Sequence, residues 1–554
     1  MTLRRYPALL VLALCPLWGA CSGDGARSDG EATPVRGGTV VVGSPSDFDY
    51  LSMLSGDKYT QDILRHALYV PLLRYDEDIE LAAGLAESWE MIGDTGAVFS
   101  LRRDVRWHDG TPTTAVDVVF TIERALDPRT TYPNTDYLAG WTGVELVDSY
   151  TVRVRFARHA QPLAGAPFLP IMPRHLLDSI PPERLRQAAF NKAPTGNGPF
   201  RFVEYRANDR TVFVANDSYP EALGGRPHVD RLIYRVISEQ AAQSTEIRTG
   251  GIDLALGAPA GDFARLDSLP AIRGIARPTR EFAFVGWNGR RPGLDDPRVR
   301  RALAMGVDRE EIIALRYGYG ELAVGPVPSY HWAFPDDIAP LPYAPDSARA
   351  LLAQAGITDR DGDAMLESPD GRDFTIELKA PASSEFNRAI AEVVRGQLAQ
   401  IGVEVRVRLL DYSTLVRDLS TRDFDAFIMA WEGDFRLNLR NTFHSAEMDG
   451  LYQFAGYANP AVDSLIDAAA LETDPERARP LFARLQRIMR DEQPWMFLYY
   501  YEDLFLARER VQNLEMDRRG AFVNVTEWWL SDQAGPAPGD SAARSPSPDS
   551  VPGQ

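Results

Sequence analysis

Short stretches of the chain alternate apolar and polar residues, which is the pattern of a strand that buries one face. Val152, Val154 and Phe156 alternate with two arginines, and this spacing predicts a half-buried strand. Residues 403–407 repeat the pattern. Further strands are predicted where the residues are mainly apolar or β-branched, at Thr39–Val42, Thr375–Leu378 and Ile428–Met429.

Other stretches place apolar residues three and four positions apart, which is the spacing of one helix face. One such stripe follows Pro112 and Thr113, and a second begins near Asn387 and stops at Gly402. The predicted core positions are Val116, Val119, Phe120 and Leu126 in the first helix, and Ile390, Val393, Val394, Leu398 and Ile401 in the second.

Three further helices are predicted from their start signals. Asp296-Pro297 and Asp474-Pro475 each join a capping side chain to a proline suited to the first turn. Asp308 followed by Glu311 predicts a capping box. The apolar positions that follow the two proline signals are Val299 and Leu303, then Leu481, Leu485 and Ile488.

Strands and helices therefore alternate along the chain. This order predicts an α/β fold in which helices cover a mostly open sheet. At 554 residues the chain is too long for one hydrophobic core, so we expect two or three domains. The sequence contains no visible internal repeat.

The first residues have the composition of an export signal. Two arginines precede an apolar stretch, Ala8–Trp18, that is too short to span a bilayer. The Gly-Ala-Cys junction at Cys21 resembles the bacterial lipobox, with a tryptophan where that pattern favours leucine. The resemblance implies a lipoprotein signal peptide over residues 1–21 and a lipid on Cys21. Cleavage of an ordinary secretory signal near Ala20 is the alternative.

Both flanks of the remaining chain are poor in large apolar residues. Residues 22–35 are rich in Ser, Gly, Asp and Ala, which predicts a flexible tether. Residues 532–554 are rich in Pro, Ser, Ala and Gly, which predicts a disordered tail. The net charge of −19, from 78 acidic and 59 basic residues, argues against a nucleic-acid partner. The charge suits a receptor for cationic or zwitterionic solutes, and solubility alone would explain it equally well.

The sequence lacks the motifs of the common catalytic sites. Its seven histidines include no pair at the spacing of a metal site on one helix. A Gly-x-Ser-x-Gly elbow, a phosphate-binding P-loop and a Gly-x-Gly-x-x-Gly turn after a strand are all missing. A glycosidase-like carboxylate pair stays open, because 78 acidic residues always supply some candidate. We therefore expect a protein without enzymatic activity, cofactor or metal.

Two segments have the appearance of sites. Residues 359–363 place carboxylates at alternate positions, as a calcium loop does, but the glycine comes two places early for an EF-hand. A plain acidic turn is the other interpretation. His108-Asp109-Gly110 precedes a helix start, where Asp-Gly is a common turn, and we interpret it as structural.

Several motifs occur in the order known from one family. They are Gly37–Val40, Leu81–Trp89, Phe99–Pro112, Gly196–Phe200, Trp287–Pro292, Asp296–Leu303, Trp431–Asp434 and Pro494–Tyr499. With these motifs the chain resembles the family 5 extracellular solute-binding proteins, the dipeptide, oligopeptide and nickel receptors of ABC importers. The resemblance covers residues 36–530.

The resemblance implies a two-lobed α/β fold like that of periplasmic binding proteins, with mixed sheets and a hinge between the lobes. Lobe I would consist of residues 36–82, 195–282 and 500–531. It would carry an accessory subdomain, residues 83–194. Lobe II would consist of residues 283–499.

The resemblance also implies a ligand site between the lobes. In peptide-binding members an aspartate of a Trp-x-x-Asp segment pairs with the ligand's α-amino group. Asp434, three residues after Trp431, matches it. Arg436 departs from the family pattern and could bind a ligand carboxylate or pair with Asp434. The other expected ligand contacts are Gly433, Trp287 and Asn288.

The resulting hypothesis is a monomeric, lipid-anchored receptor on the extracytoplasmic face of a bacterial membrane. It would capture a small peptide or peptide-like solute and deliver it to ABC permease subunits. A peptide-holding chaperone or an anchored sensor with the same fold, and an exported hydrolase, are the alternatives. A neighbouring permease gene would favour import, whereas clustered cleft residues with perturbed pKa values would favour a hydrolase.

Overall fold

One large mixed sheet organises the chain. The computed structural model describes residues 34–159, 161–433, 437–450 and 452–531. The strands of the large sheet are β1 (Thr39–Ser44), β8 (Phe200–Arg206), β9 (Arg210–Ala215), β10 (Arg231–Val236), β11 (Leu254–Ala255), β12 (Ile272–Trp287), β13 (Glu321–Leu322), β14 (Thr375–Pro381), β15 (Glu404–Leu410), β16 (Ala426–Glu432) and β17 (Trp495–Arg508). Their order is β15-β14-β16-β12-β17-β11-β1-β10-β9-β8, with β13 paired to β17.

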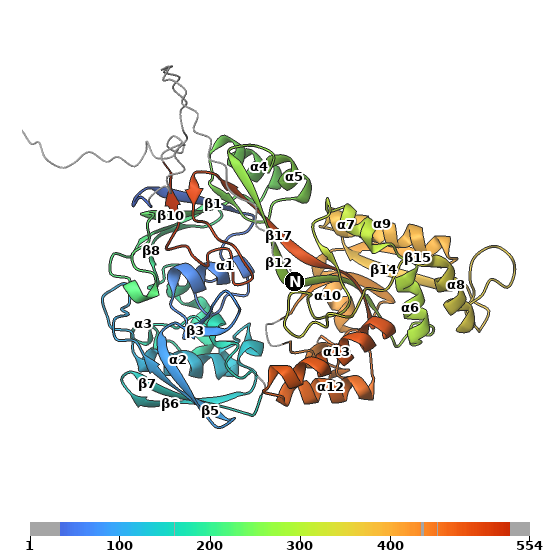
Figure 1. The fold of residues 1–554 in the computed structure, drawn as a ribbon, viewed down its shortest axis with the longest axis horizontal. Coiled ribbons are helices and arrows are strands. Elements are labelled where there is room, and N and C mark those ends of the chain that lie inside the picture. The colour runs from blue at the N-terminus through green and yellow to red at the C-terminus, as the bar shows by residue number, and fades with distance from the viewer. Residues whose placement is uncertain (1–33, 160, 434–436, 451, 532–554) are drawn as a thin grey trace, which may run out of the picture. The chain divides into compact units, whose positions relative to one another are not determined.

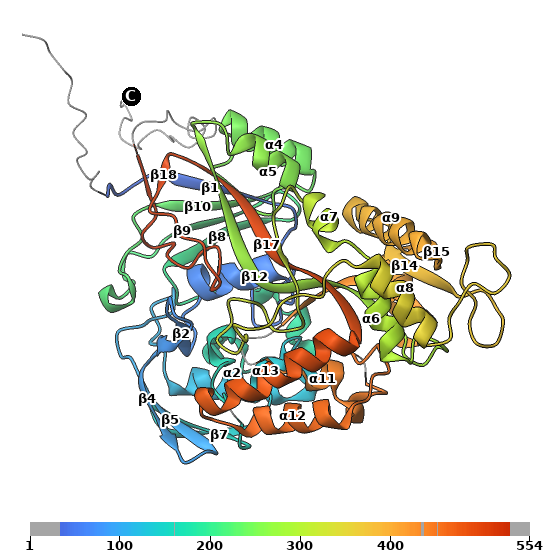
Figure 2. The ribbon, with the colours of Figure 1, turned by 45° about the vertical axis from the view of Figure 1, so that its right-hand side comes forward.

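Two long strands, β12 and β17, join the two halves of this sheet. They pair antiparallel from Ile272 opposite Arg508 to Gly286 opposite Trp495, and Figures 1 and 2 show them side by side. Strands β11, β1, β10, β9 and β8 continue the sheet on one side, and β16, β14 and β15 continue it on the other.

The pairing of these two strands is interrupted at Pro278. Pro278 lies opposite Glu502, but the next paired residue, Phe282, lies opposite Tyr500. Three residues of β12 therefore face one residue of β17. Proline has no N–H to donate to the neighbouring strand, and a bulge of this kind bends a strand and redirects its side chains. The side-chain oxygen of Thr279 bridges the bulge, since it donates to the Tyr501 carbonyl at 3.2 Å and accepts from the Glu281 N–H at 3.1 Å.

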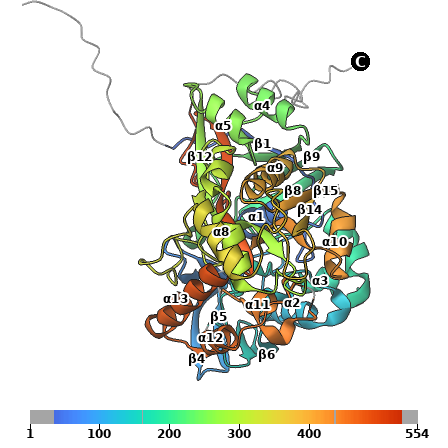
Figure 3. The same cartoon turned by 90° about the vertical axis from the view of Figure 1, so that its right-hand side faces the viewer.

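Helices cover both halves of the sheet (Figures 1 and 3). The half around β1 carries α1 (Lys58–Ile63), α4 (Gln240–Thr249) and α5 (Ala260–Leu266). The half around β14 carries α6 (Pro297–Met305), α7 (Arg309–Ala314), α8 (Pro345–Gln354), α9 (Glu385–Gln400), α10 (Tyr412–Ser420), α11 (Arg440–Phe443), α12 (Pro460–Leu471) and α13 (Pro475–Glu492). Each half has its own hydrophobic core, with Val40, Leu232 and Phe505 in one and Val285, Leu378 and Ile390 in the other.

A smaller antiparallel sheet lies between β3 and β8 in the sequence. Its order is β4 (Ala86–Ile92), β5 (Gly96–Leu101), β7 (Thr151–Phe156), β6 (Trp141–Asp148), and α2 (Ala115–Leu126) packs against it. The alternation predicted for β7 is confirmed, because Val152, Val154 and Phe156 are buried and the two intervening arginines are exposed. The remaining elements are β2 (Leu73–Tyr75), β3 (Leu81–Ala83), α3 (Arg174–Leu177), β18 (Val511–Gln512) and β19 (Trp529–Leu530).

The prediction of which face of α2 is buried is wrong, because the helix is rotated about its axis relative to the predicted orientation. Phe120 is buried, but Val116, Val119 and Leu126 are only partly buried. The helix carries apolar residues on more than one face, so spacing alone could not choose between them. Packing against the small sheet selects the face formed by Ala115, Val118, Ile122 and Ala125.

The other predicted elements are confirmed, with small shifts. Helix α9 begins at Glu385, because Ser384 accepts a hydrogen bond from the Asn387 N–H and caps it. Asp296 and Asp474 cap α6 and α13 as expected. The helix end at Gly402 agrees with its φ of 85°.

The capping box predicted for α7 is only half formed. Asp308 accepts from the N–H groups of Glu310 and Glu311, but the Glu311 side chain does not return to the Asp308 N–H. Gln397 of α9 takes both remaining roles: its Oε1 accepts from the Asp308 N–H at 2.6 Å and its Nε2 donates to Glu311 at 2.6 Å. A tertiary contact thus replaces the local one.

The motif Gly196–Phe200 has a structural basis. A Cβ on Gly196 would lie 2.1 Å from the Leu68 carbonyl oxygen, and one on Gly198 would lie 2.7 Å from the Ala67 oxygen. Asn197 between them accepts from the Val70 N–H at 2.8 Å. Both glycines are therefore required by a close backbone approach. Among the helices of the described ranges, none is long and apolar enough to cross a membrane.

Candidate ligand-binding site

A cavity of about 180 Å³ opens at the bulge of β12, and we call it the first pocket. Strand β12 contributes Arg280 and Phe282, and the end of β16 contributes Trp431, Glu432 and Gly433. The rest of the wall comes from three other places in the chain, with Pro133, Asn134, Asp136 and Tyr137 from the accessory region, Pro326, Pro328, Tyr330 and His331 from the loop after β13, and Leu437, Asn438, Leu439, Asn441, Thr442 and Phe443 from the segment at α11.

Strand pairing fixes the segment from Trp431 to Gly433. Trp431 lies opposite Phe282 and Glu432 lies opposite Glu281 in the β12–β16 ladder. The Gly433 N–H extends the ladder by donating to the Arg280 carbonyl at 3.1 Å. The backbone of this segment is therefore held rigidly at the wall of the pocket.

Aromatic side chains support this wall. Trp431 is half-buried; its ring meets Tyr452 edge-on at 5.4 Å and lies 6.1 Å from Trp495. Phe443 packs on Trp495 at 4.6 Å. Rings fixed by their neighbours can offer an apolar face to a ligand with little loss of conformational entropy.

Arg280 and Glu432 form an ion pair at the rim of the first pocket, 2.5 Å apart. The Arg280 side chain is 14% exposed and that of Glu432 is 45% exposed. Burial disfavours the Arg280 cation, but Glu432, Tyr137 and Tyr330 together outweigh it, so the pKa of Arg280 lies above its ordinary value.

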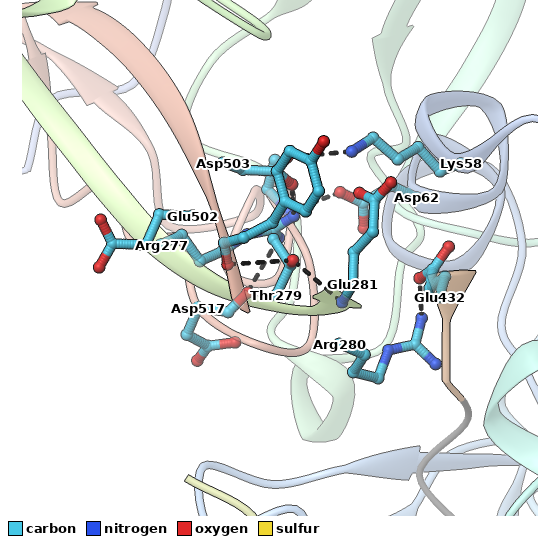
Figure 4. A network of polar contacts seen from close by, with 12 residues as sticks. Lys58, Asp62, Arg277, Thr279, Arg280, Glu281, Glu432, Glu502, Asp503 and Asp517 are labelled. Atoms are coloured by element: carbon cyan, nitrogen blue, oxygen red, sulfur yellow. Dashed lines mark hydrogen bonds and ion pairs between the residues drawn. The ribbon is translucent and has the colours of Figure 1, made fainter. Parts of the chain in front are cut away.

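A second pocket of about 140 Å³ adjoins the first and shares Asn134, Tyr137, Arg280 and Glu432 with it. Figure 4 shows charged side chains of α1, β12, β16 and β17 converging there. Its wall contains six cationic and four acidic side chains: Lys58, Arg65, Arg277, Arg280, Arg518 and Arg519, with Asp62, Glu281, Glu432 and Asp503.

Asp503 is the centre of this charged wall. Lys58 binds it at 2.9 Å and Arg277 binds it at 2.7 Å (Figure 4). Burial opposes its ionisation, but the two cations more than compensate, so the pKa of Asp503 lies below its ordinary value. Glu281 differs, since burial raises the pKa of its carboxyl and the attraction of Lys58 offsets this only in part.

The structure brings two of the predicted site residues together. Trp431 and Gly433 both line the first pocket. Asp434 and Arg436 lie outside the described residues, as does Cys21. Their predicted roles stay predictions.

Trp287 and Asn288 are not part of either pocket wall. Trp287 is 1% exposed and packs in the hydrophobic core at the far end of β12. The Asn288 amide donates to the Phe424 carbonyl at 2.9 Å and its carbonyl accepts from the Arg290 N–H. The motif that begins at Trp287 is therefore explained by the structural roles of Trp287 and Asn288. The structure gives no support to the prediction that either residue contacts the ligand.

The two segments of uncertain role in the sequence have local structural roles. Both ring nitrogens of His108 bond the backbone, at Gly196 and Gly198, and burial lowers the pKa of His108 to about 4. In the acidic loop, Asp359 accepts from the N–H groups of Gly362 and Ala364. The carboxylates of Asp359, Asp361, Asp363 and Glu367 lie within 4.8 Å of one another. The loop thus has the hydrogen bonds of an acidic turn, and calcium binding by its carboxylates stays a prediction.

Sequence reasoning missed most of the second pocket. Its charged residues come from five separate segments, so their convergence is a property of the fold. One signal was available: Arg277-Pro-Thr-Arg280-Glu281 places charges and a proline inside an otherwise apolar strand. Such an interruption favours a bulge with exposed, functional side chains.

Comparison with known proteins identifies the family. Residues 80–443 match the bacterial extracellular solute-binding proteins, family 5, over the middle region of that family. This match covers more than half of the sequence. The chain belongs to this family. Family 5 members are extracellular solute-binding proteins and not enzymes.

Individual family 5 proteins align over nearly the whole chain. The oligopeptide-binding protein AppA of Bacillus subtilis is 29% identical over 553 residues, which cover 95% of this chain and 99% of AppA. The haem-binding protein A of Haemophilus influenzae is also 29% identical, over 89% of this chain and 92% of that protein. The structure of AppA in complex with a nonapeptide superimposes with a TM-score of 0.76, covering 90% of this chain and 100% of AppA. The fold is therefore the two-lobed α/β fold of periplasmic binding proteins.

Proposed function

We propose that this family 5 protein captures a short peptide or peptide-like solute in the two joined pockets and delivers it to an ABC permease. The observation that carries the proposal is the pair of adjoining cavities, one walled by aromatic rings and the other by charges of both signs. A peptide has the same two kinds of group, apolar side chains and a zwitterionic backbone. The similarity to a protein named for oligopeptide binding supports it.

The size of the pockets favours a small ligand. Cavities of about 180 and 140 Å³ together reach the lower end of the roughly 300–1,000 Å³ range of small-molecule sites. We therefore propose a ligand of two or three residues for the state described here. Enclosure strips water from the ligand, so each charge and hydrogen bond acts at lower dielectric.

Asp434 is the proposed partner of the ligand's amine. It follows Gly433, which lines the first pocket, directly in the chain. An ammonium enclosed between lobes needs a negative partner, because an unpaired buried charge costs several kcal/mol. Arg436 remains a candidate for the ligand carboxylate or for pairing with Asp434.

The proposed lobes follow the boundaries expected from the sequence, with lobe I at residues 36–82, 195–282 and 500–531 and lobe II at 283–499. Two features support them. β12 and β17 alone run through both halves of the described sheet, and separate hydrophobic cores lie on either side. The bulge at Pro278 gives the hinge a place where the ladder is already interrupted.

Anchoring by a lipid on Cys21 is the proposed mode of membrane attachment. It rests on the short apolar stretch and the Gly-Ala-Cys junction of the sequence. Mass spectrometry of the N-terminus of the mature protein tests it. The proposal requires an acyl mass there, which Cys21→Ser removes; an unmodified N-terminus cut near Ala20 contradicts it.

Isothermal titration calorimetry with di- and tripeptides tests the binding function. Trp431→Ala should weaken binding through lost contact area. Asp434→Asn keeps the side-chain shape and removes the charge, so affinity should fall by about 2–5 kcal/mol if the pair is fully desolvated. Asp449→Asn, an exposed aspartate outside both pocket walls, is the control and should bind like the wild type. Wild-type affinity in both pocket variants would contradict the proposed site.

A further inference from the structure

Arg518 lies where the two pockets meet. It belongs to the loop between β18 and β19 and lines the second pocket. Its guanidinium lies over the ring of Tyr330, 5.2 Å from the centroid, and its Nη1 donates to the Tyr330 carbonyl at 3.5 Å. Tyr330 lines the first pocket. The side chain thus bridges the two walls.

Two anchors hold the loop that carries Arg518. On one side, Arg277 of β12 donates to the Asp517 carbonyl at 2.9 Å. On the other side, the buried carboxylate of Asp62 on α1 accepts from the Ala521 N–H at 2.5 Å. A backbone fixed at Asp517 and at Ala521 limits where the Arg518 guanidinium can lie.

The ion pairs of the second pocket leave Arg518 as an exception. Lys58 and Arg277 pair with Asp503, Arg65 pairs with Asp62, Arg280 pairs with Glu432, and Arg519 pairs with Asp517. Within the described ranges, no carboxylate lies within 4 Å of Arg518, whose contacts are the ring and carbonyl of Tyr330. It is the one cation of this wall that the described carboxylates leave uncompensated.

A half-buried guanidinium in the wall of a cavity favours an anionic partner. Its planar fork matches a carboxylate in a bidentate geometry, and such charge-assisted bonds are stronger than neutral ones. The ring of Tyr330 holds one face of the guanidinium and leaves its edge for hydrogen bonding.

We infer that Arg518 binds a carboxylate of the ligand in the second pocket, so that the protein selects peptides that carry this carboxylate over peptides in which it is replaced by an amide. This inference rests on the proposed peptide-binding function and names the selectivity of that site. The carboxylate is either the C-terminus of a short peptide or an acidic side chain, and both present the same chemistry to the guanidinium. The first pocket then receives an apolar side chain against Trp431.

Calorimetry with four tripeptide probes tests the inference. The probes are alanyl-phenylalanyl-alanine, its C-terminal amide, and two amides of alanyl-phenylalanyl peptides that end in glutamate or glutamine. Loss of a charged hydrogen bond lowers affinity about 10- to 100-fold. The wild type should therefore prefer the free acid over its amide, or the glutamate amide over the glutamine amide, by that factor. The pair that shows the preference identifies the source of the carboxylate.

Arg518→Gln should reduce this preference to about one, while Arg518→Lys should retain part of it. Arg129→Gln is the control, because it removes the same charge from a residue outside both pocket walls whose side chain is already paired with Asp127. Equal binding of the carboxylate probe and its amide counterpart by the wild type, in both pairs, would overturn the inference. Arg518→Gln could instead lower the affinity for all four probes equally. That result would also overturn the inference, since Arg518 would then act only through its structural contact with Tyr330. A wild type that binds none of the probes would instead contradict the proposed function itself.

Discussion

Asp253 and Arg510 form a fully buried ion pair beside β11. Arg510 donates to both carboxylate oxygens of Asp253, at 2.6 and 2.8 Å, and the Val41 N–H donates to the same carboxylate at 2.9 Å. Asp253 is 0% exposed and the Arg510 side chain is 6% exposed. The pair thereby ties β1 to the ends of β11 and β17.

Asp253→Asn should destabilise the protein by about 3–5 kcal/mol, because it leaves the Arg510 cation buried without its counter-charge. The control is Asp217→Asn. Asp217 lies equally close to its partner Arg226, at 2.6 Å, but its side chain is 77% exposed. An exposed pair contributes about 0–1 kcal/mol. Denaturant unfolding measures both changes, and equal effects would show that burial does not set the strength of these pairs.

Glu281 predicts a pH dependence of stability. The folded protein holds its carboxyl with a raised pKa, chiefly through burial, while Glu432, Asp503, Lys58 and Arg316 act on it from neighbouring elements. Between the ordinary value of 4.5 and the raised folded value, the folded state binds more protons than the unfolded state. The contribution of Glu281 to the unfolding free energy therefore falls as pH rises through that window.

Glu281→Gln removes this titration. The thermal unfolding temperatures of variant and wild type should converge near pH 4 and separate above it, with the variant the more stable at neutral pH. Glu90→Gln, at an exposed position of β4, serves as the control and should follow the wild type throughout. If the difference in unfolding temperature between Glu281→Gln and the wild type stayed constant from pH 4 to pH 8, this result would contradict a raised pKa at Glu281.

Among the elements, α7 and α9 depend on one side chain, Gln397. It is 7% exposed and satisfies the Asp308 N–H and the Glu311 carboxylate together. Gln397→Leu should lower the unfolding free energy by about 1–3 kcal/mol, because the Asp308 N–H and the Glu311 carboxylate both lose their hydrogen-bond partner. Gln400→Leu, at the exposed end of α9, should change the unfolding free energy by no more than about 0.5 kcal/mol. Similar decreases in the unfolding free energy of both variants would mean that the contacts of Gln397 make no specific contribution to stability.

The sequence predicted elements better than it predicted their contacts. The strong alternation of β7 and the capping signals of α6 and α13 depend on neighbours in the chain, and they were predicted correctly. The buried face of α2 and the half-formed cap of α7 depend on packing partners that no local pattern contains.

The same division applies to the site. Trp431 and Gly433 were predicted because a short motif contains them, and they line the first pocket. Arg280 and Arg518 were missed, because a bulge in β12 and a loop near the C-terminus bring them to the pockets from distant parts of the sequence. Trp287 shows the opposite error. It was predicted to contact the ligand because it belongs to a motif, but its side chain packs in the hydrophobic core.

At the scale of the whole molecule, we expect the two lobes to close about β12 and β17. Peptide added to ligand-stripped protein should lower the radius of gyration in small-angle X-ray scattering, because the ligand binds the closed state more tightly than the open one. Trp431→Ala at the same peptide concentration should show a smaller decrease. An unchanged radius in stripped wild-type protein at saturating peptide would contradict hinge closure.

The central claim, that the joined pockets hold a peptide and do not process it, is tested most directly by native mass spectrometry. Protein stripped of ligand, incubated with a library of di- and tripeptides and desalted, should carry one intact peptide per chain, and Trp431→Ala should carry less. Protein that emerges without peptide from the whole library, or that releases cleaved fragments over many turnovers, would contradict the account.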